Sequence, residues 1–139
     1  MLDPVEYLKK LIALPSVNPM GRKVDAHTVT ATCYESRVSD FLAERFEEWG
    51  ITYERHAVHS ATETSPAREN IIARLESDPS RPTLMLEVHQ DTVPVEGMTI
   101  DPFAGELRDG RIWGRGACDV KGAMACILAT ISRLVEDPP

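Results

Sequence analysis

Two short segments in the second half of the sequence carry side chains that could bind a metal ion. In residues 89–94, His89 and Asp91 lie two positions apart, directly after an apolar run. In residues 114–122, Asp119 lies in a glycine-rich turn. Imidazole and carboxylate groups are ligands that zinc accepts in proteins. The two segments together therefore predict a metal site.

The apolar run before His89 indicates how this residue is held. Residues 83–88 predict a buried strand, which would place His89 at the carboxyl edge of an α/β sheet, where such folds build their sites. Residues two apart on an extended segment point to the same face. Asp91 could then accept a hydrogen bond from one ring nitrogen of His89 while the other binds metal. The alternative is a surface histidine beside a turn-forming aspartate.

The glycine-rich turn also has two interpretations. Gly114 and Gly116 allow tight backbone conformations, and they would leave Asp119 just before the N-terminus of a helix. The helix dipole favours a carboxylate there, in a place from which it could bridge two cations. The alternative is that Asp119 caps the helix, which does not exclude metal binding.

Two phosphate-binding motifs overlap this turn, and neither is complete. Gly114 and Gly116 begin like the dinucleotide-binding motif GxGxxG, but Asp119 stands at the third glycine position, where its charge would repel a pyrophosphate. Lys121 is followed by Gly122, where a P-loop needs Ser or Thr. The sequence therefore argues against both kinds of phosphate site.

The remaining pattern mixes helices with strands and so predicts an α/β sheet. Asp3 as an N-cap before Pro4 begins the first helix, and Asp109-Gly110 marks a hairpin turn. Apolar residues at helical spacing predict three helices: residues 4–14, 35–49 and 121–135. Alternating or apolar runs predict three strands: residues 51–58, which we expect to be half-buried, 70–75 and 83–88.

Length and composition restrict the class of protein. A chain of 139 residues suffices for one domain, and its net charge of −7 argues against a nucleic-acid partner. No apolar run approaches the roughly 20 residues that cross a bilayer, and the acidic N-terminus does not look like a signal peptide. Cys33, Cys118 and Cys126 are irregularly spaced, which predicts reduced thiols. We therefore expect a cytoplasmic protein without a membrane partner.

Between residues 84 and 125 the sequence resembles the N-terminal part of the M20 metallopeptidase family. This family includes acetylornithine deacetylases, succinyl-diaminopimelate desuccinylases, aminoacylases and glutamate carboxypeptidases. The resemblance implies that residues 1–139 form the N-terminal portion of a three-layer α/β/α zinc-hydrolase catalytic domain. The dimerisation or lid domain and the C-terminal catalytic portion would be absent. The matching motifs occur in the family's order: His89-x-Asp91-Thr92-Val93-Pro94, Asp101-Pro102-Phe103, residues 109–116, and Asp119-x-Lys121-Gly122.

The resemblance also implies a role for each site residue. His89 would be a ligand to one zinc, Asp119 would bridge two zincs, and Asp91 would be the catalytic-site carboxylate that orients His89. A cis peptide bond between Asp119 and Val120 is also implied. The implied reaction is hydrolysis of the amide bond of an N-acyl amino acid or short peptide by a metal-activated water, with Zn²⁺, or Co²⁺ as a substitute. A homodimer would form through the absent domain.

Some parts of the family's metal site have no counterpart in this sequence, namely the glutamate that removes the proton from water, the remaining acidic ligand and the distal histidine. His56 and His59 are three positions apart, on opposite faces of a strand, so we expect surface residues. We place His27 in a polar loop and treat Cys118 and Cys126 as small packing residues.

Two protein ligands fall short of the three or four that zinc usually needs. We therefore expect the isolated chain to be inactive, with an exposed sheet edge and exposed helix faces that promote aggregation. One other interpretation is a non-catalytic binding module of the same fold, which an intact acidic pair and distal histidine downstream would oppose. Another is a small stand-alone α/β domain with one weak metal site, which metal binding lost in a His89→Ala variant would support.

Overall fold

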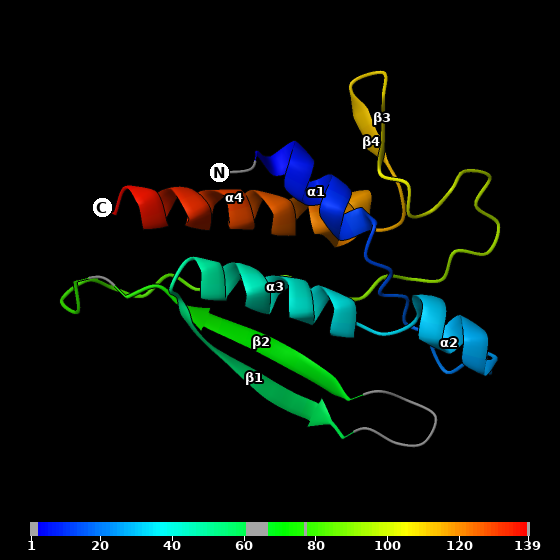
Figure 1. Cartoon of the computed structure of the whole chain (residues 1–139), viewed down its shortest axis with the longest axis horizontal. Helices are drawn as coiled ribbons and strands as arrows, with labels where there is room; N and C mark the ends of the chain where they lie inside the picture. Colours follow the sequence, from blue (N-terminus) through cyan, green and yellow to red (C-terminus); the bar gives the residue numbers. More distant parts are fainter. Residues whose placement is uncertain (1–2, 61–66, 77, 139) are drawn as a thin grey trace.

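The computed structural model describes residues 3–60, 67–76 and 78–138 (Figure 1). None of the helices in these residues is long and apolar enough to cross a membrane. The helices are α1 (Pro4–Ile12), α2 (Ala26–Thr32), α3 (Ser36–Glu48) and α4 (Gly122–Glu136). The strands are β1 (Thr52–His59), β2 (Arg68–Arg74), β3 (Glu106–Arg108) and β4 (Arg111–Trp113). A five-residue turn, η1 (Ala117–Lys121), leads into α4.

Helix α1 begins as the sequence predicts. Asp3 is its N-cap and accepts a hydrogen bond from the Glu6 amide at 2.9 Å, with Pro4 in the first turn. The helix ends at Ile12, close to the predicted boundary, and Ala13 is its C-cap. Its buried residues are Tyr7, Leu11 and Ile12, so one face of α1 points into the protein.

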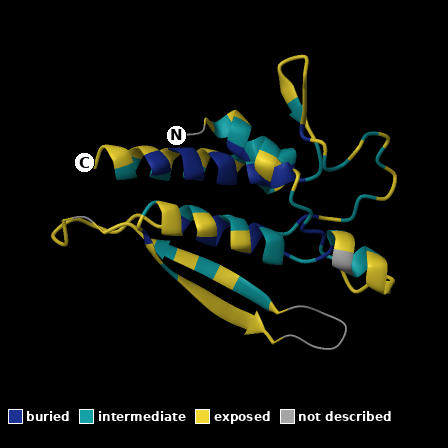
Figure 2. Cartoon of the chain, viewed as in Figure 1, coloured by how far each residue is buried: buried dark blue, intermediate teal, exposed yellow. Residues whose placement is uncertain are grey.

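Helices α1, α3 and α4 contribute to a single apolar core. Figure 2 shows buried residues along α3 and α4, with exposed residues on their outer faces. Helix α1 packs directly on α4, and α3 packs on the β1–β2 pair. The core therefore lies on one side of the β1–β2 pair. Its buried members are Tyr7, Leu11, Val38, Leu42, Phe46, Ile51, Met124, Ala125, Leu128 and Ala129.

The two predicted strands in the middle of the chain form an antiparallel pair. Thr52 lies opposite Arg74 and His59 lies opposite Arg68, with an irregular register between Ala57 and His59. The expectation of a half-buried β1 is wrong, because every residue of this strand except Tyr53 is exposed. The physical reason is that α3 packs mainly on β2, so β1 is the less covered strand of the pair.

The prediction of a buried strand at residues 83–88 is also wrong. The segment carries no strand assignment, and the side chains of Leu84 and Met85 are 80% and 79% exposed. A strand is defined by ladder hydrogen bonds to a neighbour, and the described part of the chain places no strand beside this segment. Apolar composition alone therefore does not bury it.

The hairpin predicted at Asp109-Gly110 is present as β3 and β4. Asp109 and Gly110 have φ values of +53° and +71°, which are the left-handed conformations that a two-residue hairpin turn requires. Leu107 pairs with Ile112 across the two strands.

Helix α2 was not predicted, and the placement of His27 in a loop is wrong. His27 is an exposed residue in the first turn of α2. Asp25 is the N-cap, because its carboxylate accepts hydrogen bonds from both the backbone amide and the hydroxyl of Thr28. This aspartate was the available sequence signal, but a seven-residue helix without an apolar stripe lacks the periodicity that identifies longer helices.

Candidate metal centre

The segment that carries His89 is anchored to a loop near the N-terminus. The Thr92 amide donates to the Ser16 carbonyl at 2.9 Å, and the Asn18 amide donates to the Thr92 carbonyl at 2.8 Å. These two bonds form a parallel bridge between Val17 and Thr92. Ser16 is fully buried, and its hydroxyl donates to the Gln90 carbonyl at 2.8 Å. Residues 90–92 are therefore held by backbone and side-chain hydrogen bonds to a segment more than 70 positions away.

The side chain of Gln90 adds a second anchor, from α3. Its Oε1 accepts a hydrogen bond at 2.9 Å from the hydroxyl of Ser39, which is fully buried. Its Nε2 donates to the Glu69 carbonyl at 3.4 Å. Gln90 thus connects the loop to α3 and β2. Its two neighbours in sequence, His89 and Asp91, face the site.

Both ring nitrogens of His89 face oxygen atoms. Nε2 lies 3.0 Å from Asp119 Oδ1, while Nδ1 lies 2.9 Å from the Asp91 carbonyl and 3.2 Å from Asp91 Oδ1. The side chains of His89 and Asp119 are 52% and 82% exposed, against 31% for Asp91. The structure thus brings the three predicted residues together, with Asp91 on the inner side of the ring and Asp119 on the side open to solvent.

These contacts shift the pKa of His89. Partial burial of the ring would lower its pKa, but the hydrogen bonds to Asp119 and Asp91, with the negative charges of both carboxylates, outweigh burial and raise the pKa of His89. In the metal-free chain the protonated ring can donate to both oxygens. A cation bound at Nε2 would therefore have to displace a proton.

The turn that carries Asp119 depends on two glycines at points of close approach. Gly116 has φ +78°, and a Cβ there would lie 2.6 Å from Thr92 Cγ2. A Cβ on Gly114 would lie 2.5 Å from Ile12 Cγ2. Both distances are far below normal van der Waals contact, so these positions exclude larger residues. The glycines let the Asp119 turn approach both the His89 loop and α1.

Asp119 does not cap α4. The N-cap position of α4 is Lys121, and no side chain forms a capping hydrogen bond there. Within η1, Asp119 and Val120 have non-helical backbone angles and are joined by a cis peptide bond, as the family resemblance implies. The capping interpretation of Asp119 is therefore wrong for this chain, and its carboxylate stays directed at His89.

Lys121 secures the other side of the turn. Its side chain is 1% exposed, and its ammonium donates to the carbonyls of Leu11 at 2.8 Å and Leu14 at 2.7 Å, at the C-terminal end of α1. Burial lowers the pKa of Lys121 to about 8. A cation is favoured at a helix C-terminus, where carbonyls lack helical partners. The sequence motif contained this lysine, but nothing local to it indicated its distant partners.

Comparison with known proteins identifies the family. Residues 85–139 match the sequence model of Peptidase family M20/M25/M40. A succinyl-diaminopimelate desuccinylase from Methylorubrum populi is 36% identical over 141 residues, covering 99% of this chain and 32% of that protein. The chain belongs to the M20 peptidase family. A desuccinylase from Rhizorhabdus wittichii is 34% identical over 139 residues, covering 99% of this chain and 32% of that protein.

Solved structures confirm the M20 fold at lower sequence identity. Human carnosine dipeptidase 1 superposes with a TM-score of 0.76 at 24% identity, covering 96% of this chain and 28% of that chain. The dipeptidase Dug1p from Saccharomyces cerevisiae superposes with a TM-score of 0.71 at 22% identity, covering 94% and 28%. The predicted α/β fold class, as part of an M20 catalytic domain, is therefore confirmed. The chain spans about a third of the length of its curated relatives.

The donor atoms of the candidate site suit a divalent metal but are few. His89 Nε2 and Asp119 Oδ1 converge, and a nitrogen with a carboxylate oxygen is a donor pair that zinc accepts. Within residues 3–60, 67–76 and 78–138, no group of three or more His, Cys, Asp or Glu side chains could hold a metal ion. His56 and His59 are exposed on β1, as predicted.

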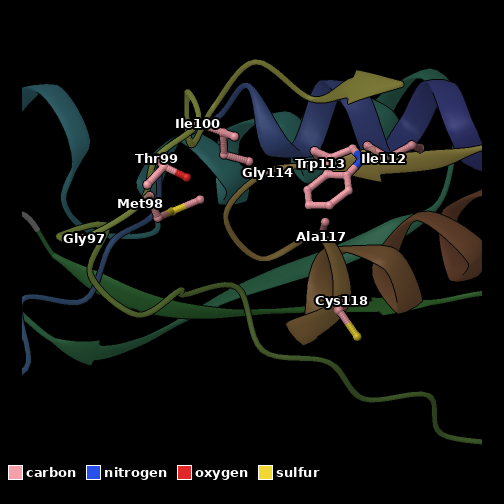
Figure 3. Close-up of a pocket in the computed structure, with 9 residues that line it drawn as sticks. All are labelled: Gly97, Met98, Thr99, Ile100, Ile112, Trp113, Gly114, Ala117 and Cys118. Atoms are coloured by element: carbon pink, nitrogen blue, oxygen red, sulfur yellow. The ribbon is translucent and has the colours of Figure 1, made fainter. Parts of the chain in front are cut away.

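The interpretation of two cysteines as packing residues is wrong. Cys118 and Cys126 are both exposed, whereas Cys33 is buried. Cys126 lies on an outer position of α4, and Cys118 lies at an open groove of about 410 Å³ beside the Asp119 turn (Figure 3). Met98 and Trp113 are among the side chains that line this groove. An apolar groove therefore lies beside the candidate site.

Proposed function

We propose that the protein carrying this chain is a metal-dependent hydrolase that cleaves the amide bond of an N-acyl amino acid or a short peptide. The observation that carries the proposal is the approach of His89 Nε2 to Asp119 Oδ1 at 3.0 Å, with Asp91 on the opposite ring nitrogen. Membership of the M20 family supports it, as do relatives named succinyl-diaminopimelate desuccinylase.

In this proposal each of the three side chains has one role. His89 would bind one Zn²⁺ through Nε2, and Asp119 would bridge two Zn²⁺ ions through its carboxylate. Asp91 would accept a hydrogen bond from Nδ1–H through its backbone carbonyl, with carboxylate Oδ1 at 3.2 Å, and so fix the ring with Nε2 free for metal. Bound zinc would supply Lewis-acid polarisation of the amide carbonyl and a water of lowered pKa.

We further propose that residues 1–139 are the N-terminal portion of a larger catalytic domain. Only two of the three or four protein ligands that zinc usually takes come together in the described residues. The remaining ligands and the proton-accepting glutamate would come from the part of the relatives that this chain does not span. On this proposal the chain by itself does not hydrolyse amides.

The test uses the complete protein, purified and dialysed. We expect bound zinc, together with zinc-dependent hydrolysis of N-succinyl or N-acetyl amino acids or of dipeptides. The variant His89→Ala should lose activity by at least a hundredfold and retain less zinc, on the scale expected when a ligand to the metal is lost. The variant His27→Ala is a matched control, because His27 is exposed on α2. Full activity without metal, or in His89→Ala, would contradict the proposal.

A further inference from the structure

Asn18 contacts the metal centre from behind Asp91. Its Nδ2 donates to Asp91 Oδ2 at 2.9 Å, across 73 positions of sequence. The other carboxylate oxygen, Oδ1, lies 3.2 Å from His89 Nδ1. The two oxygens of Asp91 therefore have different partners, and the Asn18 amide determines which oxygen can face the ring.

The direction of the Asn18 amide is fixed by a second hydrogen bond. Its Oδ1 accepts from the Met20 backbone amide at 2.9 Å, in a turn in which Met20 has φ +53°. The Met20 N–H is a donor, so the atom of the Asn18 amide that faces it is the oxygen. The NH₂ group must then face Asp91. Asn18 thus presents a donor, and not an acceptor, to the carboxylate.

The backbone of Asn18 is fixed relative to Asp91 as well. The Asn18 amide donates to the carbonyl of Thr92, the residue after Asp91, at 2.8 Å. Val17 bridges both Thr92 and Cys33, so the loop lies between two extended segments. An exposed loop could drift relative to the carboxylate that it contacts, but these bonds prevent this for Asn18.

A charged side chain also lies near Asp91. The guanidinium of Arg68 pairs with both carboxylate oxygens of Glu35, and it also interacts electrostatically with Asp91. A charge acting at a distance does not select a rotamer of the Asp91 side chain. Among the described residues, Asn18 is the side chain that donates a hydrogen bond to the Asp91 carboxylate away from His89.

We propose that Asn18 is a positioning residue for the metal centre. By holding Asp91 Oδ2, it keeps Oδ1 at 3.2 Å from His89 Nδ1, beside the Asp91 backbone carbonyl that lies 2.9 Å from the same nitrogen. The carboxylate and the carbonyl together keep His89 Nε2 directed toward Asp119. The inference rests on the proposed metal site, and it assigns to Asn18 a role in metal affinity beyond the anchoring of the backbone. Without the amide, Asp91 could rotate away from the ring, and the ring would be less well ordered for a metal.

The first experiment measures zinc affinity in the complete protein by competition with a chelating dye. We expect Asn18→Ala to weaken zinc binding on the order of tenfold, and Asp91→Ala to weaken it by at least as much, as is usual for the outer partners of metal ligands. If Asn18 acts through Asp91, adding Asn18→Ala to Asp91→Ala changes nothing further. Additive losses, or unchanged affinity in Asn18→Ala, would overturn the inference.

Two variants control for damage to the loop. Asn70→Ala removes the other asparagine of this sequence, which is exposed on β2, and it should leave zinc affinity unchanged. Asn18→Ser keeps a side-chain acceptor for the Met20 amide but is too short to reach Asp91. It should therefore reproduce the loss in Asn18→Ala with a smaller change in melting temperature. A Ser variant with full affinity would overturn the inference.

The second experiment separates this inference from the proposed function. In metal-free protein, the His89 Hδ1 proton is observed by NMR and assigned by its absence in His89→Ala. Asn18→Ala and Asp91→Ala should move this resonance upfield to similar positions, because both remove the carboxylate charge from Nδ1 and keep the backbone carbonyl of Asp91 as its hydrogen-bond partner. If the wild-type protein binds no zinc, the proposed function fails and the resonance still decides the role of Asn18. An unmoved resonance in Asn18→Ala overturns that role.

Discussion

Two adjacent stretches of this chain have opposite environments. Residues 83–87 are all exposed, with Leu84 and Met85 among the most exposed apolar side chains of the protein. Residues 90–92, immediately downstream, are tied by hydrogen bonds to the loop at residues 16–18 and to α3. The more apolar stretch is thus the exposed one, and the more polar stretch is the one that is fixed.

The difference shows what positions the candidate site in this chain. A strand is stabilised by ladder partners and by layers on its faces, and residues 83–87 have neither among the described residues. The His89 loop instead uses specific hydrogen bonds and close contacts with glycine. The site geometry therefore depends on the N-terminal loop, on α3 and on the buried Lys121, and not on the segment that leads into it.

Loss of Lys121 should have the largest effect on the fixed region. Lys121→Ala removes a buried stem and two hydrogen bonds to the carbonyls of Leu11 and Leu14. We expect the free energy of unfolding to fall by about 4 kcal/mol, from cavity formation together with a carbonyl left unsatisfied. Urea denaturation measures this. Lys10→Ala, an exposed lysine of α1, is the control and should change stability by less than about 0.5 kcal/mol.

A glycine substitution tests whether close approach matters beyond backbone strain. Gly116→Ala places a Cβ 2.6 Å from Thr92 Cγ2 at φ +78°, so we expect a loss of about 3 kcal/mol from strain and overpacking. Gly21 has a similar φ of +76° but open space around its Cβ position. Gly21→Ala should therefore cost only about 1 kcal/mol. Equal losses in the two denaturation curves would mean that the contact with Thr92 contributes nothing.

The candidate site was predictable from sequence where its signals are local. The His89-x-Asp91 spacing and the glycines around Asp119 describe geometry within a few residues, and the structure brings these groups together. The N-cap at Asp3 and the turn at Asp109 were predictable for the same reason. Each depends on backbone conformations that a short motif determines.

The contacts that hold the site together were not predictable in this way. Lys121 reaches Leu11 across 110 positions, and Asn18 reaches Asp91 across 73. No local pattern in the sequence records such a pairing. The error at residues 83–88 has a related cause, because an apolar run indicates that a segment can be buried, whereas its burial depends on which other segments lie beside it.

The pKa of Lys121 predicts a smaller, pH-dependent effect. This pKa is about 8 in the folded chain, against the ordinary lysine value of 10.5 in an unfolded chain, so between these values the unfolded chain binds more protons. The free energy of unfolding should therefore rise as pH increases from about 8 toward 10.5. Denaturation across this range measures the slope. Lys121→Met removes the titrating group, and its slope should be lower than that of the wild-type chain; equal slopes would contradict the assignment.

The smallest effect on stability is expected in the exposed stretch at residues 83–87. Leu84→Lys and Met85→Lys should change the free energy of unfolding of this chain by less than about 0.5 kcal/mol, because both side chains are already in solvent. The same variants should raise the monomer fraction in analytical ultracentrifugation, since they interrupt an exposed apolar run that can join molecules.

The complete protein gives the opposite expectation for these two variants. If the remainder of an M20 catalytic domain covers residues 83–87, a lysine at Leu84 or Met85 becomes a buried charge, and stability falls by several kcal/mol. Leu42→Lys in α3 is the matched control. Leu42 is already buried in the core of this chain, so this substitution should destabilise both this chain and the complete protein. A Leu84→Lys variant that is neutral in the complete protein would show that this segment remains uncovered there.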